Sequence, residues 1–356
     1  MKIDLVNDGF WGSCGKGGIA GYMAKRFPYT AVVCAYGTQA GHTYNDRERG
    51  IHMMVQQLPV GISSPHVRGV FIGPGALIHA DTLRRELRDY GGMLAGKRIF
   101  IHEHAAVVED YHSEYEHADG RTKMGSTAKG VGEAAIERIR RKDDANVVKN
   151  RWKGTDLEQY IADRFTYLEE LTKHTEILVE GAQGFGLSMY HGEYPFVTSR
   201  DVSPWQICGD CGLPFSWASD IRVVSVCRTH PIRVNNRDGS SGPAYPGQKE
   251  LIWSDVGVDP ELTTVTKLPR RVFEWSHTQM QHASVMCASA SHPVALTFAD
   301  YCRDKEELSE ILESIFNAND ANWISYVVAG PDDSDVFEPE SINSIFKFME
   351  GRYNAN

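Results

Sequence analysis

The chain of 356 residues is long enough to bury a large core, and its hydrophobic content of 42% and charged content of 24% are typical of a soluble globular protein. Its net charge of −10 argues against a protein that binds duplex DNA or RNA, because such proteins usually present a basic surface. A small phosphorylated substrate stays compatible with that charge, since a local pocket can be positive within an acidic protein.

The composition also bears on the cellular location. No apolar run reaches the length of a membrane span, and Asp4 interrupts the N-terminal apolar stretch, which argues against a signal peptide. The seven scattered cysteines, an odd number, suit a reducing cytoplasm. Cys208 and Cys211 form one CxxC motif without a second pair at zinc-finger spacing, which is a weak metal signal. We therefore expect a cytoplasmic protein without a membrane or nucleic-acid partner.

Short apolar runs rich in β-branched residues alternate with charged amphipathic stretches along the chain. The apolar runs predict strands at 2–6, 30–35, 69–73, 97–101, 176–180, 221–227, 293–298 and 323–329. The amphipathic stretches predict helices at 80–90, 132–142, 156–173 and 304–318. This alternation predicts an α/β fold with a mostly parallel central sheet and flanking helices. Without repeats or long linkers, we expect a single domain over residues 1–356, with a surface loop at 236–250.

Residues 5–18, LVNDGFWGSCGKGG, lead from an apolar run through glycines and a lysine into a predicted helix. In such a segment, backbone N–H groups and the lysine bind phosphate. The spacing G-x5-G-K is one residue longer than that of a usual phosphate loop, and no Ser or Thr follows Lys16. The motif alone is therefore weak, and a simple glycine-rich turn is the alternative.

Other polar, glycine-containing segments follow predicted strands. GTQAGHT (37–43) follows the strand at 30–35, and EGAQG (180–184) follows the strand at 176–180. Parallel α/β sheets bind ligands at such strand ends. HGEYPFVTS (191–199) and AGPD (329–332) add to the pattern.

Together these motifs resemble the adenylosuccinate synthetase family, along nearly the whole chain and in the same order. The family's W-G-D-E-G-K-G-K, N-A-G-H-T and T-T-G-R-G-I-G correspond to WGSCGKGG (11–18), QAGHT (39–43) and STAKGVG (126–132). Its E-G-A-Q-G is unchanged, and its Y-P-Y-V-T-S and T-G-P-D correspond to YPFVTS (194–199) and AGPD (329–332). The resemblance implies the P-loop-like nucleotide-binding architecture of that family.

The resemblance also implies a reaction. Family members phosphorylate the 6-oxygen of a purine monophosphate, and the amine of aspartate then displaces that phosphate. By position, Lys16 would neutralise charge on the transferring phosphoryl group, and His42 would act as the general acid. Gln183 would hydrogen-bond the purine. A purely structural role is the alternative for His42.

Further site residues follow from the matched positions. The purine monophosphate would be held by Ser13, Gln39, Thr127, Gln183 and Thr198. Arg141 of a partner subunit would also contact it, which implies a homodimer. The alternative for Arg141 is a position on a solvated helix face. Aspartate would be bound by Thr264, Thr266 and Arg270, although Leu268 and Pro269 stand where the family has arginines. The donor nucleotide would contact Gly12, Gly15, Lys16, Gly17, Gly41, His42, Thr43, Phe298, Asp300, Gly330 and Pro331. Mg²⁺ would be bound at Ser13 and Gly41.

Ser13 departs from the family pattern, in which an aspartate acts as the base toward N1 and helps to hold Mg²⁺. One interpretation is an inactive relative. The other is a changed substrate, because guanine carries a 2-amino group beside N1 and the shorter serine leaves room for it. This substitution is associated with the bacteriophage branch of the family, which acts on dGMP with ATP or dATP on the path to 2-aminoadenine DNA. Asp8, Cys14 or a substrate carboxylate could replace the missing base.

A second departure concerns the donor nucleotide. The family's T-K-L-D corresponds to TFAD (297–300), so Phe298 replaces the lysine that covers the guanine base of GTP. A phenylalanine ring can stack on any purine, which relaxes guanine selection, and a core phenylalanine is the alternative.

Three other functions remain open at this point. An ordinary adenylosuccinate synthetase would use IMP and GTP, and a non-catalytic protein would bind a nucleotide without releasing phosphate. A P-loop GTPase switch is the third, and the GAQG and YPFVT motifs argue against it. For a phage enzyme the cytoplasm would be that of the host.

Overall fold

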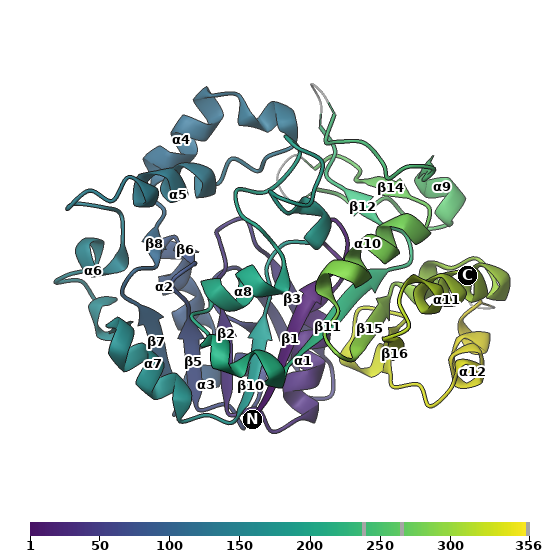
Figure 1. The fold of residues 1–356 in the computed structure, drawn as a ribbon, viewed down its shortest axis with the longest axis horizontal. Helices are drawn as coiled ribbons and strands as arrows, with labels where there is room; N and C mark the ends of the chain where they lie inside the picture. Colours follow the sequence, from purple (N-terminus) through teal and green to yellow (C-terminus); the bar gives the residue numbers. More distant parts are fainter. Residues whose placement is uncertain (237–239, 264–266, 354–356) are drawn as a thin grey trace.

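The computed structural model describes residues 1–236, 240–263 and 267–353, and its fold is shown in Figure 1. A ten-stranded sheet has the order β17-β16-β15-β11-β1-β10-β2-β5-β7-β9. Its strands are β1 (Lys2–Asp8), β2 (Ala31–Cys34), β5 (Gly69–Ile72), β7 (Arg98–His102), β9 (Ile161–Ala162), β10 (Glu176–Glu180), β11 (Ile221–Arg228), β15 (His292–Thr297), β16 (Asn322–Val328) and β17 (Val336–Phe337). Within the described residues, every pairing in this sheet is parallel except that of β17 with β16.

All the strands predicted from sequence lie in this sheet, and the predicted fold class is confirmed. β9 and β17 form its two edges and are too short to give a sequence pattern. Smaller sheets pair β3 (His42–Asp46) with β4 (Ile51–Val55), β6 (Leu77–Ile78) with β8 (Ala106–Val107), and β14 (Arg271–Phe273) with β12 (Ile232–Arg233) and β13 (Glu250–Leu251).

Helices flank the central sheet. The α-helices are α1 (Lys16–Arg26), α2 (Ala80–Asp89), α3 (Gly91–Leu94), α4 (Asp110–Ala118), α5 (Val131–Ile139), α6 (Val148–Arg151), α7 (Arg164–Thr172), α8 (Pro204–Asp210), α9 (Trp253–Val256), α10 (His277–Cys287), α11 (Lys305–Ala318) and α12 (Ile342–Tyr353). Short 3-10 turns cover 60–63, 121–124, 158–160, 185–187, 215–220, 299–301 and 333–335. Among the described residues, no helix is both long enough and apolar enough to cross a membrane.

The predicted helix at 156–173 is wrong in its first half, because α7 begins only at Arg164. The side chain of Asp163 accepts hydrogen bonds from the N–H groups of Phe165 and Thr166, which caps the helix at that point. The preceding residues form a 3-10 turn and β9 instead.

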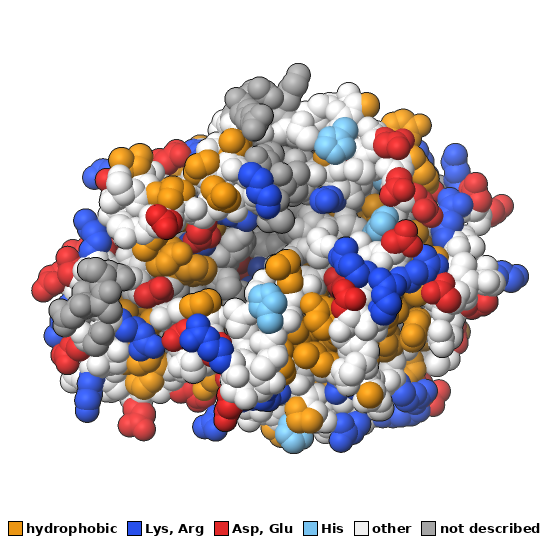
Figure 2. Space-filling view, turned by 180° about the vertical axis from the view of Figure 1, so that it is seen from behind, with side chains coloured by type: hydrophobic (Ala, Val, Ile, Leu, Met, Phe, Trp, Pro, Cys, Tyr) orange, Lys and Arg blue, Asp and Glu red, His pale blue; other side chains and the backbone are white. Residues whose placement is uncertain are grey.

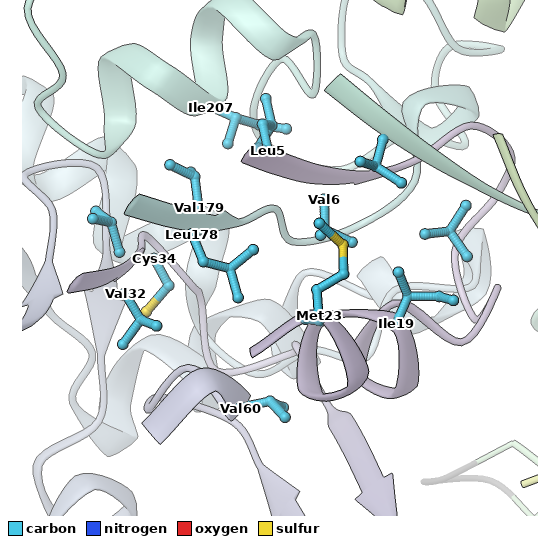
Figure 3. Close-up of a cluster of buried hydrophobic side chains, with 14 of the residues drawn as sticks. Leu5, Val6, Ile19, Met23, Val32, Cys34, Val60, Leu178, Val179 and Ile207 are labelled. Carbon is cyan, nitrogen blue, oxygen red and sulfur yellow. The ribbon is translucent and has the colours of Figure 1, made fainter. Parts of the chain in front are cut away.

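The core beneath the phosphate loop fixes the start of α1 (Figure 3). Ile19 and Met23 of α1 pack on one face of the sheet beside Val6, whereas Ile207 of α8 lies on the other face beside Leu5. All of these side chains are buried, and each contributes about 1.5–3 kcal/mol by leaving water. The packed helix therefore holds Lys16, its first residue, at the end of β1.

Because the strands are parallel, the loops that follow β1, β2, β10, β11 and β15 all emerge at one edge of the sheet. In Figure 1 this edge faces α4, α5 and α10, away from the N-terminus. The segments that carry the family motifs begin at this edge.

Candidate active site

The loop at 9–15, between β1 and α1, is wrapped around the carboxylate of Asp8. This fully buried group accepts hydrogen bonds from the N–H groups of Phe10 (3.0 Å), Gly12 (3.2 Å) and Cys14 (3.2 Å). The ammonium of Lys16 lies 3.1 Å from the same carboxylate. Asp8 thus occupies alternate N–H groups of the loop, and the first N–H groups of α1, which have no intrahelical partner, are left for a phosphate.

Ser13 is the side chain of this loop that a substrate can reach. It is exposed and has a left-handed φ of 56°, and its carbonyl accepts a hydrogen bond of 3.0 Å from Arg228. Asp8 and Cys14 are both fully buried, and burial raises the pKa of the Cys14 thiol. Their burial argues against either residue as the replacement for the family's base.

His42, at the start of β3, is buried against the ring of Tyr36, with 4.4 Å between the ring centroids. Burial, with the positive charge of Lys16, lowers the pKa of His42 to about 3. The ring is therefore neutral at pH 7, whereas a free imidazole titrates close to that pH. Among the described residues Nδ1 has no hydrogen-bond partner, although it is buried. Such an atom is costly to leave unpaired, which points to a ligand.

The QAGHT and STAKGVG segments meet beside α5. The hydroxyl of Thr38 donates a 2.9 Å hydrogen bond to the carbonyl of Lys129, and the buried Oε1 of Gln39 has no partner within the described part of the chain. Thr127 is half-buried in the same segment. The YPFVTS segment is adjacent, since a Cβ placed on Gly132 would lie 3.9 Å from that of Ser199. Three of the predicted monophosphate ligands, Gln39, Thr127 and Thr198, thus belong to adjoining segments.

The EGAQG segment packs directly on the phosphate loop. Gly184 is so close that a Cβ there would overlap the backbone nitrogen of Gly12. Gln183 precedes Gly184 and has a left-handed φ of 67°, so its segment is packed against the loop that carries Ser13. Glu180 has a structural role instead, because its buried carboxylate accepts hydrogen bonds from two backbone N–H groups and from the hydroxyl of Tyr36.

In the TFAD segment, Thr297 and Phe298 reach this loop. Thr297, at the end of β15, donates a 2.8 Å hydrogen bond to the carbonyl of Cys14. The half-buried ring of Phe298 would lie 3.8 Å from a Cβ on Gly15, so Phe298 borders the loop rather than the core. Asp300 keeps a buried Oδ1 without a partner among the described residues, and burial raises the pKa of its carboxyl.

Other predicted nucleotide contacts line β3. Gly17 packs so tightly there that its Cβ would lie 2.6 Å from the carbonyl oxygen of Thr43, and both Gly41 and Thr43 are exposed. Pro331, which follows Gly330, accepts a 2.9 Å hydrogen bond from Asn45 of β3.

Within the residues that the structure describes, Arg141 is not brought into this group, and Arg270 reaches it only through Glu261, which pairs with Arg228. Arg141 is exposed just after α5, and its side chain has no partner among the described residues. Arg270 is half-buried, and burial lowers the pKa of its guanidinium. Thr264 and Thr266 lie outside the described residues.

Two buried arginines were missed by the sequence analysis. Arg228 pairs with Glu261 at 2.5 Å, and its guanidinium lies 3.9 Å from the ring centroid of Phe298. Arg233 donates to the carbonyl of Phe196 and stacks over Trp11 at 4.8 Å, and burial lowers its pKa to about 10. Both arginines end or follow an apolar strand. This position in the sequence is the signal that could have predicted them.

Positive charge gathers around a concave part of the surface. Figure 2 shows a hollow near the middle of the face opposite to that of Figure 1, with Lys and Arg side chains among those on its rim. Such a rim can attract phosphorylated ligands despite the negative net charge.

The described residues offer few side chains that could bind a metal ion. The described residues contain no group of three or more His, Cys, Asp or Glu side chains arranged to hold a metal. The exposed hydroxyl of Ser13 and the carbonyl of the exposed Gly41 are oxygen donors of the kind that Mg²⁺ prefers. Mg²⁺ commonly takes its other ligands from substrate phosphates and water, so these residues fit such a site.

A model of the family described as adenylosuccinate synthetase matches residues 6–150 and 143–314. The chain therefore belongs to the adenylosuccinate synthetase family, as the motifs predicted. The N6-succino-2-amino-2'-deoxyadenylate synthase of Acinetobacter phage SH-Ab 15497 is 38% identical, over 92% of this chain and 90% of that one. The adenylosuccinate synthetase of Pyrococcus sp. (strain ST700) is 32% identical, over 84% of both chains.

A solved structure adds a ligand-bound relative. The cyanophage S-2L succinoaminodeoxyadenylate synthetase, bound to dGMP and to dATP as an energy donor, superposes with a TM-score of 0.90. It is 35% identical, and the match covers 99% of this chain and 98% of that chain. The similarity to the phage branch is thus confirmed in both sequence and fold.

Proposed function

We propose that the protein is a ligase that joins L-aspartate to the 6-position of dGMP, with ATP or dATP as the phosphoryl donor. The product would be N6-succino-2-amino-2'-deoxyadenylate. The observation that carries this proposal is the exposed Ser13, which stands where the family has an aspartate. The phage synthase relatives, one of them bound to dGMP and dATP, support it.

The proposed reaction has two steps. In the first, the 6-oxygen of guanine attacks the γ-phosphorus, the bond to the β-phosphate oxygen breaks, and N1 loses its proton. Lys16 would offset the negative charge of the transferring group, and Gln183 would orient the purine. In the second step the amine of aspartate attacks C6, the C6–O bond breaks, phosphate leaves, and the attacking nitrogen gives up a proton.

The protonation of His42 follows from its environment. Burial and the charge of Lys16 keep the imidazole neutral, so it can donate only one N–H. A bound phosphate would bring negative charge to the ring and favour its protonated form. The histidine would thereby become a proton donor only when the donor nucleotide is present, which suits a general acid for the departing phosphate.

The loss of the N1 proton requires a different arrangement from that of the family. The loop offers a serine hydroxyl in place of the carboxylate, and Asp8 and Cys14 are buried. We propose that a substrate carboxylate accepts the proton. The weak acidity of guanine N1 would lessen the need for a strong base on the protein.

We assign the other ligands to residues of the matched motifs. Gln39, Thr127 and Thr198 would hold the substrate phosphate. The ring of Phe298 would stack on an adenine, with Asp300 nearby. Mg²⁺ would be held by Ser13 and Gly41 with the phosphates, and it would stabilise the negative charge of the reacting groups.

The proposal also covers the binding of aspartate and the oligomeric state. Thr264, Thr266 and Arg270 would bind aspartate. The exposed Arg141 would contact the monophosphate bound to a partner subunit, so the active form would be a homodimer. All seven cysteines are free and buried, which is compatible with work in the reducing cytoplasm of a host cell.

A phosphate-release assay tests the proposal. The purified chain is supplied with Mg²⁺, ATP and aspartate, and IMP, GMP and dGMP are compared at equal concentrations. We expect release to be fastest with dGMP and to require aspartate, with a product whose mass equals dGMP plus aspartate less one water. Faster release with IMP would favour an ordinary adenylosuccinate synthetase, and nucleotide binding without release would favour a non-catalytic protein.

A further inference from the structure

Arg228, at the end of β11, lies where three parts of the proposed site meet. Its side chain is fully buried, and one Nη donates a 3.0 Å hydrogen bond to the carbonyl of Ser13 in the phosphate loop. The guanidinium also lies over the ring of Phe298, and its other Nη pairs with Glu261. The phosphate loop, Phe298 and Glu261 therefore all contact the same cation.

The contact with Phe298 is close. The guanidinium carbon lies 3.9 Å from the ring centroid, and the ring of Tyr301 meets Phe298 edge-on at 5.1 Å. A guanidinium on one face of an aromatic ring, shielded from water, is a favourable cation–π contact. Phe298 has a left-handed φ of 56°, so its backbone conformation is one that needs support from its surroundings.

Glu261 fixes the orientation of Arg228. Both carboxylate oxygens face the guanidinium, at 2.5 Å and 3.4 Å, and the hydroxyl of Tyr301 donates to the same carboxylate at 3.3 Å. A two-point carboxylate contact holds a guanidinium in one plane. The carbonyl of Glu261 also accepts the N–H of Arg270, which ties this arrangement to the proposed aspartate site.

One donor of Arg228, the Nε–H, has no protein partner among the described residues, although it is buried. A buried donor without a partner carries a free-energy cost, so burial of Arg228 is not explained by hydrogen bonding alone. The contacts with Ser13, Phe298 and Glu261 together set the direction of the guanidinium plane.

We infer that Arg228 is a positioning residue. It supports the Phe298 ring, on which the donor base would stack, and it holds the Ser13 backbone at a fixed distance from that ring. Glu261 keeps the guanidinium in the plane that this requires. The inference rests on the proposed function, because it takes Phe298 to contact the donor base. It assigns donor-base recognition to a pair of residues, in which Phe298 touches the base and Arg228 acts through Phe298.

A double-mutant cycle on nucleotide binding tests this inference without requiring turnover. The dissociation constant of ATP is measured by calorimetry for the wild type, Arg228→Lys, Phe298→Leu and the double variant. Lysine keeps the charge but loses the planar contact, so we expect Arg228→Lys to weaken ATP binding by about tenfold. In the Phe298→Leu background the same change should cost about twofold or less, because the platform is already lost.

Arg222→Lys is the matched control, since Arg222 lies on the same strand and pairs with Asp4 at its opposite end. We expect it to leave ATP binding unchanged in both backgrounds. Glu261→Gln should weaken ATP binding in the same direction as Arg228→Lys, and the midpoint of thermal unfolding shows that each variant is folded. Losses that simply multiply in the double variant, or unchanged binding in Arg228→Lys, would overturn the inference. Failure of the dGMP assay alone would instead overturn the proposed function.

Discussion

At the scale of single residues, the site is built on charges that the fold holds away from water. Asp8 and Lys16 form a buried pair at 3.1 Å, and Asp8 also binds three N–H groups of the loop. Because these N–H groups stabilise the carboxylate, the loop does not depend on Lys16 alone for its shape. We propose that Lys16 also serves the transferring phosphoryl group.

Lys16→Ala tests that role. Removal of charge stabilisation in the transition state should lower kcat by roughly 100-fold or more, and His42→Ala should have a similar effect. Lys25→Ala is the control, because Lys25 lies on the same helix but pairs with Asp46 and Asp333. The steady-state kcat is measured for the three folded variants. Near-normal kcat in Lys16→Ala or His42→Ala would remove that residue from the mechanism.

The neutral state of His42 makes a prediction about stability. Its pKa is about 3 in the folded chain and about 6.5 when the chain is unfolded, so the unfolded state binds more protons between these values. His42 should therefore leave the free energy of unfolding unchanged above pH 6.5. Below pH 6.5 it should lower that free energy by about 1.4 kcal/mol for each pH unit. Urea unfolding of the wild type and of His42→Gln between pH 7.5 and pH 5 measures the difference. Parallel pH dependences in the two proteins would show that His42 is not held neutral.

At the scale of elements, two loops must approach each other closely for the site to form. Gly184→Ala would place a Cβ against the backbone of Gly12, and a backbone atom cannot rotate away as a side chain can. We expect a loss of about 1–3 kcal/mol in the free energy of unfolding. The specificity constant should fall at least about tenfold, because Gln183 would shift relative to Ser13.

Gly209→Ala is the control for this variant. Gly209 lies inside α8, and its Cβ would have no atom within 4 Å. Alanine in a helix is favoured over glycine by roughly 0.5–1 kcal/mol, so this variant should be slightly more stable and fully active. Chemical unfolding and the specificity constant are measured for both variants. Equal behaviour of the two would show that the packing of the EGAQG segment is not required.

The same elements show what a sequence can predict. Strands such as β10, at Glu176–Glu180, were found with their bounds because buried parallel strands are continuous apolar runs. The half-wrong helix at 156–173 shows that charge periodicity does not reveal where a cap such as Asp163 starts the helix. The motifs predicted roles for Lys16, His42 and Gln183, and these roles stay predictions. Arg228 and the inward direction of Asp8 depend on loop conformation, and the low pKa of His42 depends on burial, so a single sequence could not predict them.

At the scale of the whole molecule, the exposed Arg141 predicts that the active site is shared between subunits. Lys16→Ala and Arg141→Ala should each be nearly inactive alone. In a mixture with random exchange, half of the dimers are hybrids and one of their two sites is intact, so about a quarter of full activity should return. Activity after mixing and the mass of the protein by light scattering test this. A fully active monomer at high dilution would contradict the shared site.

We propose that Ser13 makes the chain select dGMP over IMP, and the ratio of specificity constants for the two substrates tests this selection. The ratio is measured for the wild type and for Ser13→Asp, which places a longer, ionised side chain beside the 2-amino group. A crowded or badly paired group in a tight site costs about 1–3 kcal/mol, so the ratio should fall by roughly ten- to a few-hundred-fold, and IMP use should hold or rise. Because the fraction of folded enzyme cancels in the ratio, a general loss of protein does not affect it. An unchanged ratio, or a wild type that already prefers IMP, would contradict the account.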